Sequence, residues 1–328
     1  MKKTLIISIF SMIFIIFSAL FLPNIDKKHD INCRVGDYDC LESYFDNYSN
    51  SHSPKSAINR LYEVKKIKDY SQYCHTLAHF LGKKYYNLYN SPMKALNLGG
   101  KSCSDGYYHG VIEEYARQID SDTYTKQIND ICASILDKYL NMDCIHGIGH
   151  GSYIIAKRNP VVASKICNNL ASDFNILMCT SGVFMQFSLD ERLRPNTLDN
   201  LLNICDKDIS TKYREACLNN IFLKISIKDF DGDFSHLRVL CDQLTQTQRV
   251  SCYYGIGYAG SGLIEFDPSK YPSVCGTKED EASLKCVYRL SQGYGAVYSR
   301  KLMINKICPL FRNKQRDYCL SVEEVKLR

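Results

Sequence analysis

Apolar residues recur at helical spacing along most of the chain, in stretches that end or begin at a cysteine. Five stretches lead up to a cysteine, among them "NPVVASKIC" and "NTLDNLLNIC", and five others start at one, among them "CIHGIGHGSYIIA" and "CLNNIFLKISI". Apolar side chains at intervals of three and four residues give a helix one hydrophobic face. Signals for a helix start, such as Asn159-Pro160, precede several of the stretches. The pattern predicts pairs of short helices, in which the first cysteine ends one helix and the second opens the next.

The cysteines also mark a repeat. Six pairs, with ten or eleven residues between the two members, follow one another from Cys132 to Cys319. The first members of these pairs recur after 35, 38, 36, 34 and 33 residues. Such a period is typical of stacked helical hairpins, in which each unit packs on its neighbours. We therefore predict an all-α array of about six or seven disulfide-stapled helical hairpins, similar to an α-solenoid, with an irregular N-terminal cap.

The regular spacing predicts disulfides in sequential pairs, the first cysteine with the second, the third with the fourth, and so on along the chain. Six of these bonds close short loops: Cys132–Cys144, Cys167–Cys179, Cys205–Cys217, Cys241–Cys252, Cys275–Cys286 and Cys308–Cys319. Cys33 and Cys40 form another local loop in the cap, and Cys74 pairs with Cys103 by elimination. Closed loops of this size contribute about 2–4 kcal/mol each in the loop-entropy description.

The chain divides into four segments. Residues 1–25 contain Lys2, Lys3 and an apolar run, which indicates a signal peptide or an uncleaved N-terminal membrane anchor. Residues 26–70 form the cap and a linker that includes the polar stretch "DNYSNSHSPKS", residues 71–160 hold histidine-rich repeats, and residues 161–328 hold the C-terminal hairpin repeats. Either N-terminal signal makes the protein extracytoplasmic: periplasmic, secreted or anchored to the outer face of a membrane. Sixteen cysteines fit such an oxidising location.

Composition and charge narrow the range of partners. The chain is 45% hydrophobic, which fits a folded protein, and its formal net charge is +6. Half of that charge comes from residues 1–28, which hold four lysines and one aspartate. No basic tract interleaved with aromatic residues is present, so we expect no nucleic-acid partner. We expect membrane contact only through the N-terminal segment, and the repeat surface is a candidate site for a protein or peptide partner.

Two positions in the second helix of each unit carry the candidate chemistry, two and six residues after the cysteine. In the first unit these positions hold Asp105 and His109, and in the second unit they hold His146 and His150. In the later units the residue six after the cysteine is Met185, Leu223, Tyr258 or Gln292. The stretch "CHTLAHFLG" adds His75 and His79, also four residues apart. Residues four apart lie on one face of a helix, one turn from each other. Five of the eight histidines thus belong to such pairs within 76 residues.

These pairs predict a metal centre, because imidazole and carboxylate groups in adjacent helices can converge on one ion. The predicted metal ligands are His75, His79, Asp105, His109, Glu113, His146 and His150. Catalytic roles are expected for Glu113, His109 and His150, with Glu113 as ligand or general base and Asp105 as an alternative orienting group. The metal is divalent or redox-active: Zn, Fe, Mn or Cu.

The sequence leaves three classes of function open. The first is a metalloenzyme, either a metal-activated hydrolase or an oxidase. The second is a non-enzymatic metal-binding or delivery protein, with the same ligands closed around the ion. The third is a solenoid that binds a protein or peptide and whose histidines are structural. Glycines near His146 and His150 also fit close helix packing alone, since "CYYGIGYAG" has similar glycines and no histidine. Ligand positions do not recur in every unit, which favours one localised site.

Overall fold

The structure is a computed structural model of the 328-residue chain. It describes residues 31–71, 73–100, 103, 106–190, 198–209, 211–230, 232–264, 267–297 and 299–322. Within these ranges the chain forms helices and turns and contains no strand. The predicted signal peptide or membrane anchor, residues 1–25, lies outside the described residues. Among the helices described, none combines the length and the apolar character needed to span a membrane.

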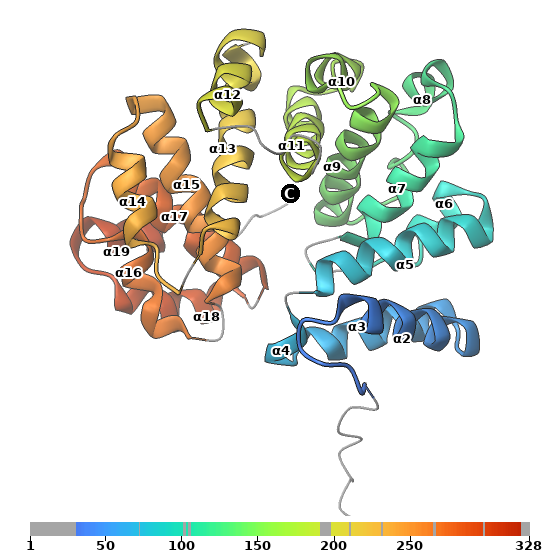
Figure 1. The fold of residues 1–328 in the computed structure, drawn as a ribbon, viewed down its shortest axis with the longest axis horizontal. Coiled ribbons are helices and arrows are strands. Elements are labelled where there is room, and N and C mark those ends of the chain that lie inside the picture. The colour runs from blue at the N-terminus through green and yellow to red at the C-terminus, as the bar shows by residue number, and fades with distance from the viewer. Residues whose placement is uncertain are drawn as a thin grey trace, which may run out of the picture.

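In the described part of the chain, seven long helices stand side by side and carry most of the core. They are α5 (Cys74–Tyr89), α7 (Gly106–Gln118), α9 (Lys138–Ile155), α11 (Asp173–Leu189), α13 (Thr211–Lys228), α15 (Gln246–Leu263) and α17 (Glu281–Val297). Each of them packs on the next one. Figure 1 shows that the series follows an arc, so that α15 and α17 lie across its centre from α7 and α9.

Shorter helices alternate with the long ones and complete the hairpins. They are α6 (Pro92–Leu96), α8 (Ser121–Gln127), α10 (Pro160–Cys167), α12 (Leu198–Asn203), α14 (Ser235–Asp242), α16 (Tyr271–Cys275) and α18 (Arg300–Leu302), with α19 (Asn313–Leu320) last. Short π and 3-10 turns extend some of them: η3 (Ile204–Asp208), η4 (Pro268–Lys270), η5 (Met303–Ile307) and η6 (Cys308–Leu310). The predicted all-α array of disulfide-stapled hairpins is therefore confirmed.

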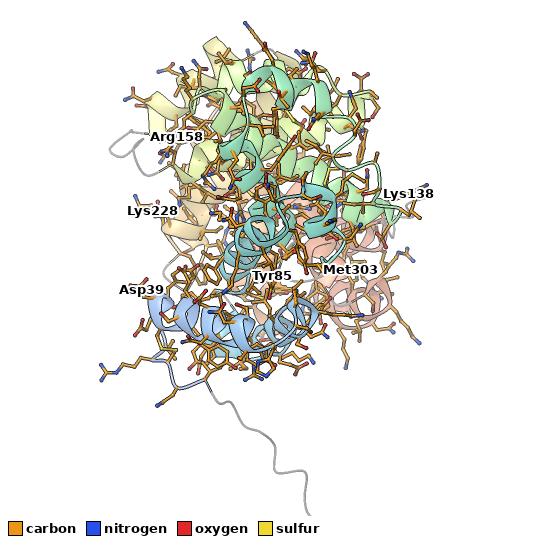
Figure 2. The ribbon with its side chains drawn as sticks, turned by 90° about the vertical axis from the view of Figure 1, so that its right-hand side faces the viewer. Asp39, Tyr85, Lys138, Arg158, Lys228 and Met303 are labelled. Atoms are coloured by element: carbon orange, nitrogen blue, oxygen red, sulfur yellow. A yellow bond between two sulfur atoms is a disulfide. The ribbon has the colours of Figure 1, made fainter. Side chains whose placement is uncertain are left out.

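The N-terminal cap consists of α2 (Tyr38–Ser51), α3 (Pro54–Lys65) and α4 (Lys68–Ser71). Figure 2 shows α2 and α3 at one end of the array, next to α5 with its buried Tyr85. The polar stretch predicted to be a linker is helical on both sides of a short turn, and Ser53 caps α3 by accepting from the backbone N–H of Ser56. The sequence of this stretch resembles a linker because α2 buries only a narrow face, formed by Leu41, Phe45 and Ser49.

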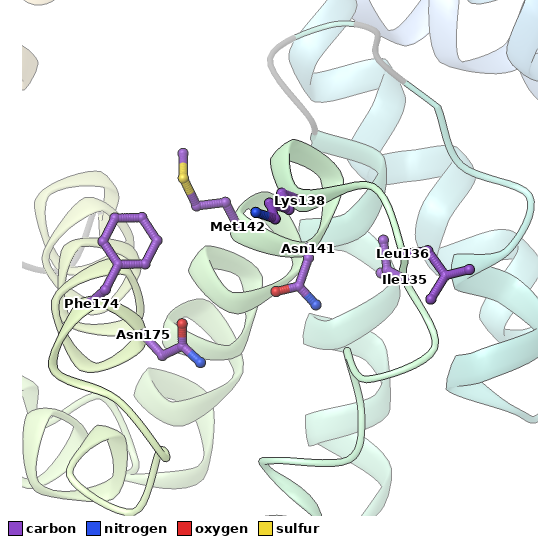
Figure 3. Close-up of a pocket in the computed structure, with 7 residues that line it drawn as sticks. All are labelled: Ile135, Leu136, Lys138, Asn141, Met142, Phe174 and Asn175. Carbon is purple, nitrogen blue, oxygen red and sulfur yellow. The ribbon is translucent and has the colours of Figure 1, made fainter. Parts of the chain in front are cut away.

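A shallow pocket of about 210 Å³ lies where α9 and α11 begin (Figure 3). Its lining residues are Ile135, Leu136, Lys138, Asn141, Met142, Phe174 and Asn175. Leu136 is 93% exposed and Phe174 is 53% exposed, so the rim of this pocket is apolar and open to solvent. Lys138 is the one charged residue in the lining, and the pocket offers little chemistry of its own.

All eight predicted disulfides are present, each between consecutive cysteines, and no cysteine remains free. Such a set of disulfides is typical of an oxidising environment outside the cytoplasm. The prediction that the second cysteine opens its helix is wrong by about two turns, since α9 begins at Lys138, well before Cys144. The helix starts early because the side chain of Asp137 accepts from the backbone N–H groups of Tyr139 and Leu140.

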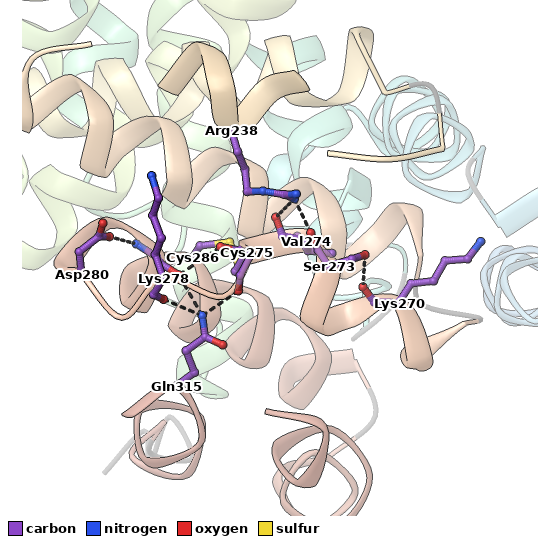
Figure 4. Close-up of a disulfide and its surroundings, with 11 residues drawn as sticks. Arg238, Lys270, Ser273, Val274, Cys275, Lys278, Asp280, Cys286 and Gln315 are labelled. Carbon is purple, nitrogen blue, oxygen red and sulfur yellow. Dashed lines mark hydrogen bonds between the residues drawn. A yellow bond between two sulfur atoms is a disulfide. The ribbon is translucent and has the colours of Figure 1, made fainter. Parts of the chain in front are cut away.

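Side chains of two other units bind the loop closed by the Cys275–Cys286 disulfide and the helix end before it (Figure 4). Arg238 of α14 donates to two backbone carbonyl oxygens just before the loop, those of Ser273 and Val274 in α16. Gln315 of α19 donates to the carbonyl oxygens of Gly276 and Lys278, both at 2.9 Å, and to Ser283 Oγ at 3.0 Å. Carbonyls at a helix end have no partner within the helix. The disulfide therefore fixes a segment whose carbonyl oxygens accept hydrogen bonds from the neighbouring units.

We expect the double variant Cys275→Ser/Cys286→Ser to lower the free energy of unfolding by about 2–4 kcal/mol. The physical reason is that the open chain gains conformational freedom in the unfolded state, while the loop contacts of Arg238 and Gln315 lose a fixed partner. Urea unfolding followed by circular dichroism, under non-reducing conditions, measures the change. A loss below about 1 kcal/mol would contradict a stapling role for this bond.

Candidate metal centre

Glycines bring the long helices of the early units into close contact. A Cβ atom added to Gly110 of α7 would lie 2.1 Å from the carbonyl oxygen of His79 in α5. One added to Gly149 of α9 would lie 1.9 Å from the carbonyl oxygen of Cys179 in α11. Real Cβ atoms essentially never come within 3.0 Å of a non-bonded heavy atom from another part of the chain. Only glycine therefore permits these helix pairs to approach so closely, and the approach of α5 and α7 places their histidines side by side.

Six of the seven predicted ligands lie together between α5, α7 and α9: His75, His79, His109, Glu113, His146 and His150. The centroids of neighbouring imidazole rings are 4.4 to 5.8 Å apart. His109 and His150 are buried, whereas His75, His79 and His146 are partly exposed. Asp105, the seventh predicted ligand, lies outside the described residues.

Glu113 is the centre of the polar contacts in this cluster. Its Oε1 atom accepts from His79 Nδ1 at 3.2 Å and from His150 Nδ1 at 3.1 Å. Its Oε2 atom lies 3.2 Å from Lys83 Nζ and 3.7 Å from Arg117 Nη2. The side chain is only 3% exposed, so a charge there needs such partners. Both carboxylate oxygens are thus engaged by groups of the chain itself.

Lys83 and Arg117 are parts of the site that the sequence prediction missed. Lys83 follows His79 by four residues in α5, and Arg117 follows Glu113 by four residues in α7. The same four-residue spacing that identified the histidines was therefore the signal that would have found them. Glu114, the neighbour of Glu113, pairs instead with Arg117 at 3.1 Å and is not part of the histidine cluster.

Burial keeps most of the imidazoles neutral, and the neighbouring histidines keep the carboxylate charged. Loss of hydration, together with electrostatic repulsion between protonated His75 and protonated His79, lowers the pKa of His75 to about 3. Loss of hydration also lowers the pKa values of three other histidines: His79, His109 and His146. Burial alone raises the pKa of Glu113, but His79 and His150 together hold that pKa well below its usual value. The unfolded chain protonates His75 near pH 6.5 and the folded chain only near 3, so stability falls as the pH drops through this range.

His75 and His79 direct two nitrogen lone pairs at the same place. His75 Nδ1 donates to the carbonyl oxygen of Cys103 at 2.9 Å, and His79 Nδ1 donates to Glu113. A neutral imidazole carries one N–H, so the Nε2 atom of each ring is an acceptor. These two Nε2 atoms are nevertheless 3.1 Å apart, and neither can donate to the other. Two nitrogen ligands of a tetrahedral zinc ion lie about 3.3 Å apart, so the spacing fits a shared cation.

Three further ring nitrogens in the cluster are buried and have no hydrogen-bond partner in the described structure: His109 Nδ1, His146 Nε2 and His150 Nε2. An unpaired buried polar atom costs about 1–3 kcal/mol. The cluster contains two overlapping sets of donors within 4.8 Å of one another, which we term the first histidine group (His75, His79 and His109) and the second histidine group (His109, His146 and His150). A third set consists of His79, Glu113 and His150. The donors therefore fit a metal ion, which would satisfy nitrogens that the protein leaves unpaired.

No known protein family matches the chain, and no curated protein or solved structure matches it either. Relationship to other proteins therefore says nothing about the use of the histidine cluster. Its chemistry has to be inferred from the geometry of the cluster, the burial of its members and the state of their nitrogens.

Proposed function

We propose that this chain is an exported metalloenzyme, a metal-activated hydrolase or oxidase, whose metal ligands are five histidines: His75, His79, His109, His146 and His150. The observation that carries the proposal is the pair of facing, unprotonated Nε2 atoms of His75 and His79, 3.1 Å apart. Two lone pairs at that distance repel each other unless a cation lies between them. Imidazole ligands favour Zn, Cu or Fe over Mn, which prefers oxygen donors.

Glu113 acts in this proposal as an orienting group rather than as a ligand or general base. Its Oε1 atom holds the Nδ1–H groups of His79 and His150, which turns the Nε2 atom of each ring towards the cluster. Carboxylates that hold metal-bound histidines in this way fix the ring and make it a stronger ligand. Lys83 and Arg117 lie beside the second oxygen of the carboxylate, where their positive charges balance its negative charge.

The two histidine groups share His109, so the cluster has room for one ion or for two neighbouring ions. A zinc ion bound there would lower the pKa of a coordinated water towards about 7, and iron or copper would bring redox chemistry. His109 and His150 are buried and close the site on one side. His75, His79 and His146 are partly exposed, and a substrate would approach from their side.

A non-enzymatic metal-binding or delivery protein is the second candidate. It is favoured by the burial of His109 and His150 and of the unpaired nitrogen atoms of His109, His146 and His150. In such a protein the ligands would close around the ion and leave no position for a substrate. Azide binding to cobalt- or copper-substituted protein, followed by visible spectroscopy, separates the two: a spectral shift supports the enzyme, and an unchanged spectrum supports the carrier.

We expect protein purified without chelator to contain one or two ions of Zn, Fe or Cu per chain, because the histidine nitrogens lack other partners. Removing the metal should lower the stability by about 4 kcal/mol if the free ion had stood at about 1,000 times its Kd. Plasma mass spectrometry and thermal unfolding before and after chelation measure both effects. Less than a stoichiometric amount of metal, with no rebinding, would contradict the proposal.

A further inference from the structure

A partly buried arginine in the later units is held by aromatic and amide side chains. The guanidinium of Arg289, in α17, stacks on the ring of Tyr258, with Cζ 3.8 Å from the ring centroid. Its Cζ atom also lies 5.3 Å from the centroid of Tyr254, and its Nη1 atom donates to Gln292 Oε1 at 2.6 Å. Aromatic faces hold a planar guanidinium in a fixed orientation. The side chain is therefore positioned by its neighbours.

The residues that hold Arg289 occupy the repeat positions that carry histidines in the early units. Tyr254 and Tyr258 stand two and six residues after the second cysteine of their unit, as His146 and His150 do in theirs. Gln292 stands at the sixth position of the following unit. The same face of the repeat helices therefore carries the histidine cluster at one end of the array and a bound arginine towards the other.

Arg289 has no carboxylate partner among the residues that the structure describes. Its Nε atom is buried and has no acceptor. Arg249, in the preceding unit, is different, because it pairs with Asp242 at 3.0 Å and with Asp280 at 2.6 Å. A guanidinium is always charged, and a buried donor on a charged group is costly when it has no acceptor. The position is suited to an anion from outside the chain.

Arg289 also interacts electrostatically with the histidine cluster. Helix α17 lies across the arc from α9 (Figure 1). The positive charge of Arg289 interacts electrostatically with His146 in α9. Arg289 interacts electrostatically with Tyr139 as well, which lies about two turns before His146 in the same helix. Arg289 and His146 therefore lie within electrostatic reach of each other, and their helices face each other across the arc.

We propose that Arg289 binds the anionic group, a phosphate or a carboxylate, of the molecule that reaches the metal centre. The inference rests on the proposed function, because the metal is the second anchor of that molecule. A guanidinium offers two parallel N–H donors to such a group, and Tyr258 and Gln292 fix the direction in which they point. The substrate class is thus a small anionic molecule, with its reacting part near His146.

Binding of inorganic phosphate, measured by calorimetry, tests this inference on metal-loaded and on chelator-treated protein. The chelated sample excludes direct binding of phosphate to the metal. We expect Arg289→Gln to weaken phosphate binding about tenfold or more in both samples. Arg289→Lys should weaken it less, because lysine keeps the positive charge and loses only the two parallel N–H donors of the guanidinium. Arg316→Gln, at an exposed position of α19, should leave phosphate binding unchanged. Acetate titrations in parallel show whether the site prefers phosphate or carboxylate.

Equal phosphate and acetate affinities in wild type and in both Arg289 variants would overturn the inference, as would a wild type that binds neither anion. Metal analysis of the same samples separates this outcome from the proposed function. Retained metal with unchanged anion binding contradicts only the role of Arg289. A metal-free wild type that loses phosphate binding in Arg289→Gln contradicts the metal centre and supports the anion site.

Discussion

The variant His109→Gln should lose its metal, with a fall in affinity of about 100-fold or more. His109 is the one histidine that belongs to both histidine groups, so its replacement removes a ligand from each. Its ring also stacks on that of His150, with centroids 4.4 Å apart, and glutamine fills much of the vacated volume. Competition with a coloured chelator of known affinity measures the loss, and circular dichroism shows that the helices remain.

Two control variants make that result specific. His236→Gln changes an exposed histidine of α14, outside the cluster. Met185→Ala changes the repeat position in α11 that corresponds to His150 in α9. Both should keep the wild-type metal content. Wild-type metal affinity in His109→Gln would show that the histidine groups are packing features, and metal loss in Met185→Ala would show that the site is not confined to the early units.

The variant Gly149→Ala should lower the free energy of unfolding by about 3 kcal/mol, although alanine is normally the better helix former. The added Cβ would lie 1.9 Å from the carbonyl oxygen of Cys179 and 2.7 Å from the backbone nitrogen of Val183. Both are backbone atoms, so α9 and α11 must move apart. Because His150 is the next residue, metal affinity should fall with the stability. Urea unfolding and metal analysis of the same preparation measure the two effects.

Gly262→Ala is the matched control, because a Cβ at that position in α15 would meet nothing within 4 Å. It should leave the stability unchanged or raise it by up to about 1 kcal/mol, through the better helix propensity of alanine. Equal stabilities of Gly149→Ala and Gly262→Ala would mean that the close approach of α9 and α11 does not depend on glycine.

The repeat and its disulfides could be predicted because they are local features of the chain. Each of the six repeat staples joins cysteines only 11 or 12 positions apart, and their even spacing leaves few alternatives. The helix starts were harder to place. A single capping side chain, such as that of Asp137, begins α9 about two turns before the cysteine. In the cap, only Leu41, Phe45 and Ser49 form the buried face of α2, which gives too few apolar positions to predict a helix there.

The members of the histidine cluster could be predicted because residues four apart on a helix share a face. Their protonation could not, because it depends on the acceptors that each ring meets, such as the Cys103 carbonyl beside His75. Arg289 could not be placed near His146 either, since the curvature of the array decides which distant units face each other (Figure 1). That curvature arises from small rotations between many units and has no local sequence signal.

Anomalous X-ray diffraction at the absorption edge of the bound metal, from crystals grown without chelator, tests the central claim most directly. We expect a peak within about 2.0–2.3 Å of the Nε2 atoms of His75 and His79, with Glu113 still hydrogen-bonded to His79. A second peak, if two ions are bound, should lie among His109, His146 and His150. A map without a peak in the cluster, or with metal only at an exposed histidine such as His52, would contradict the account.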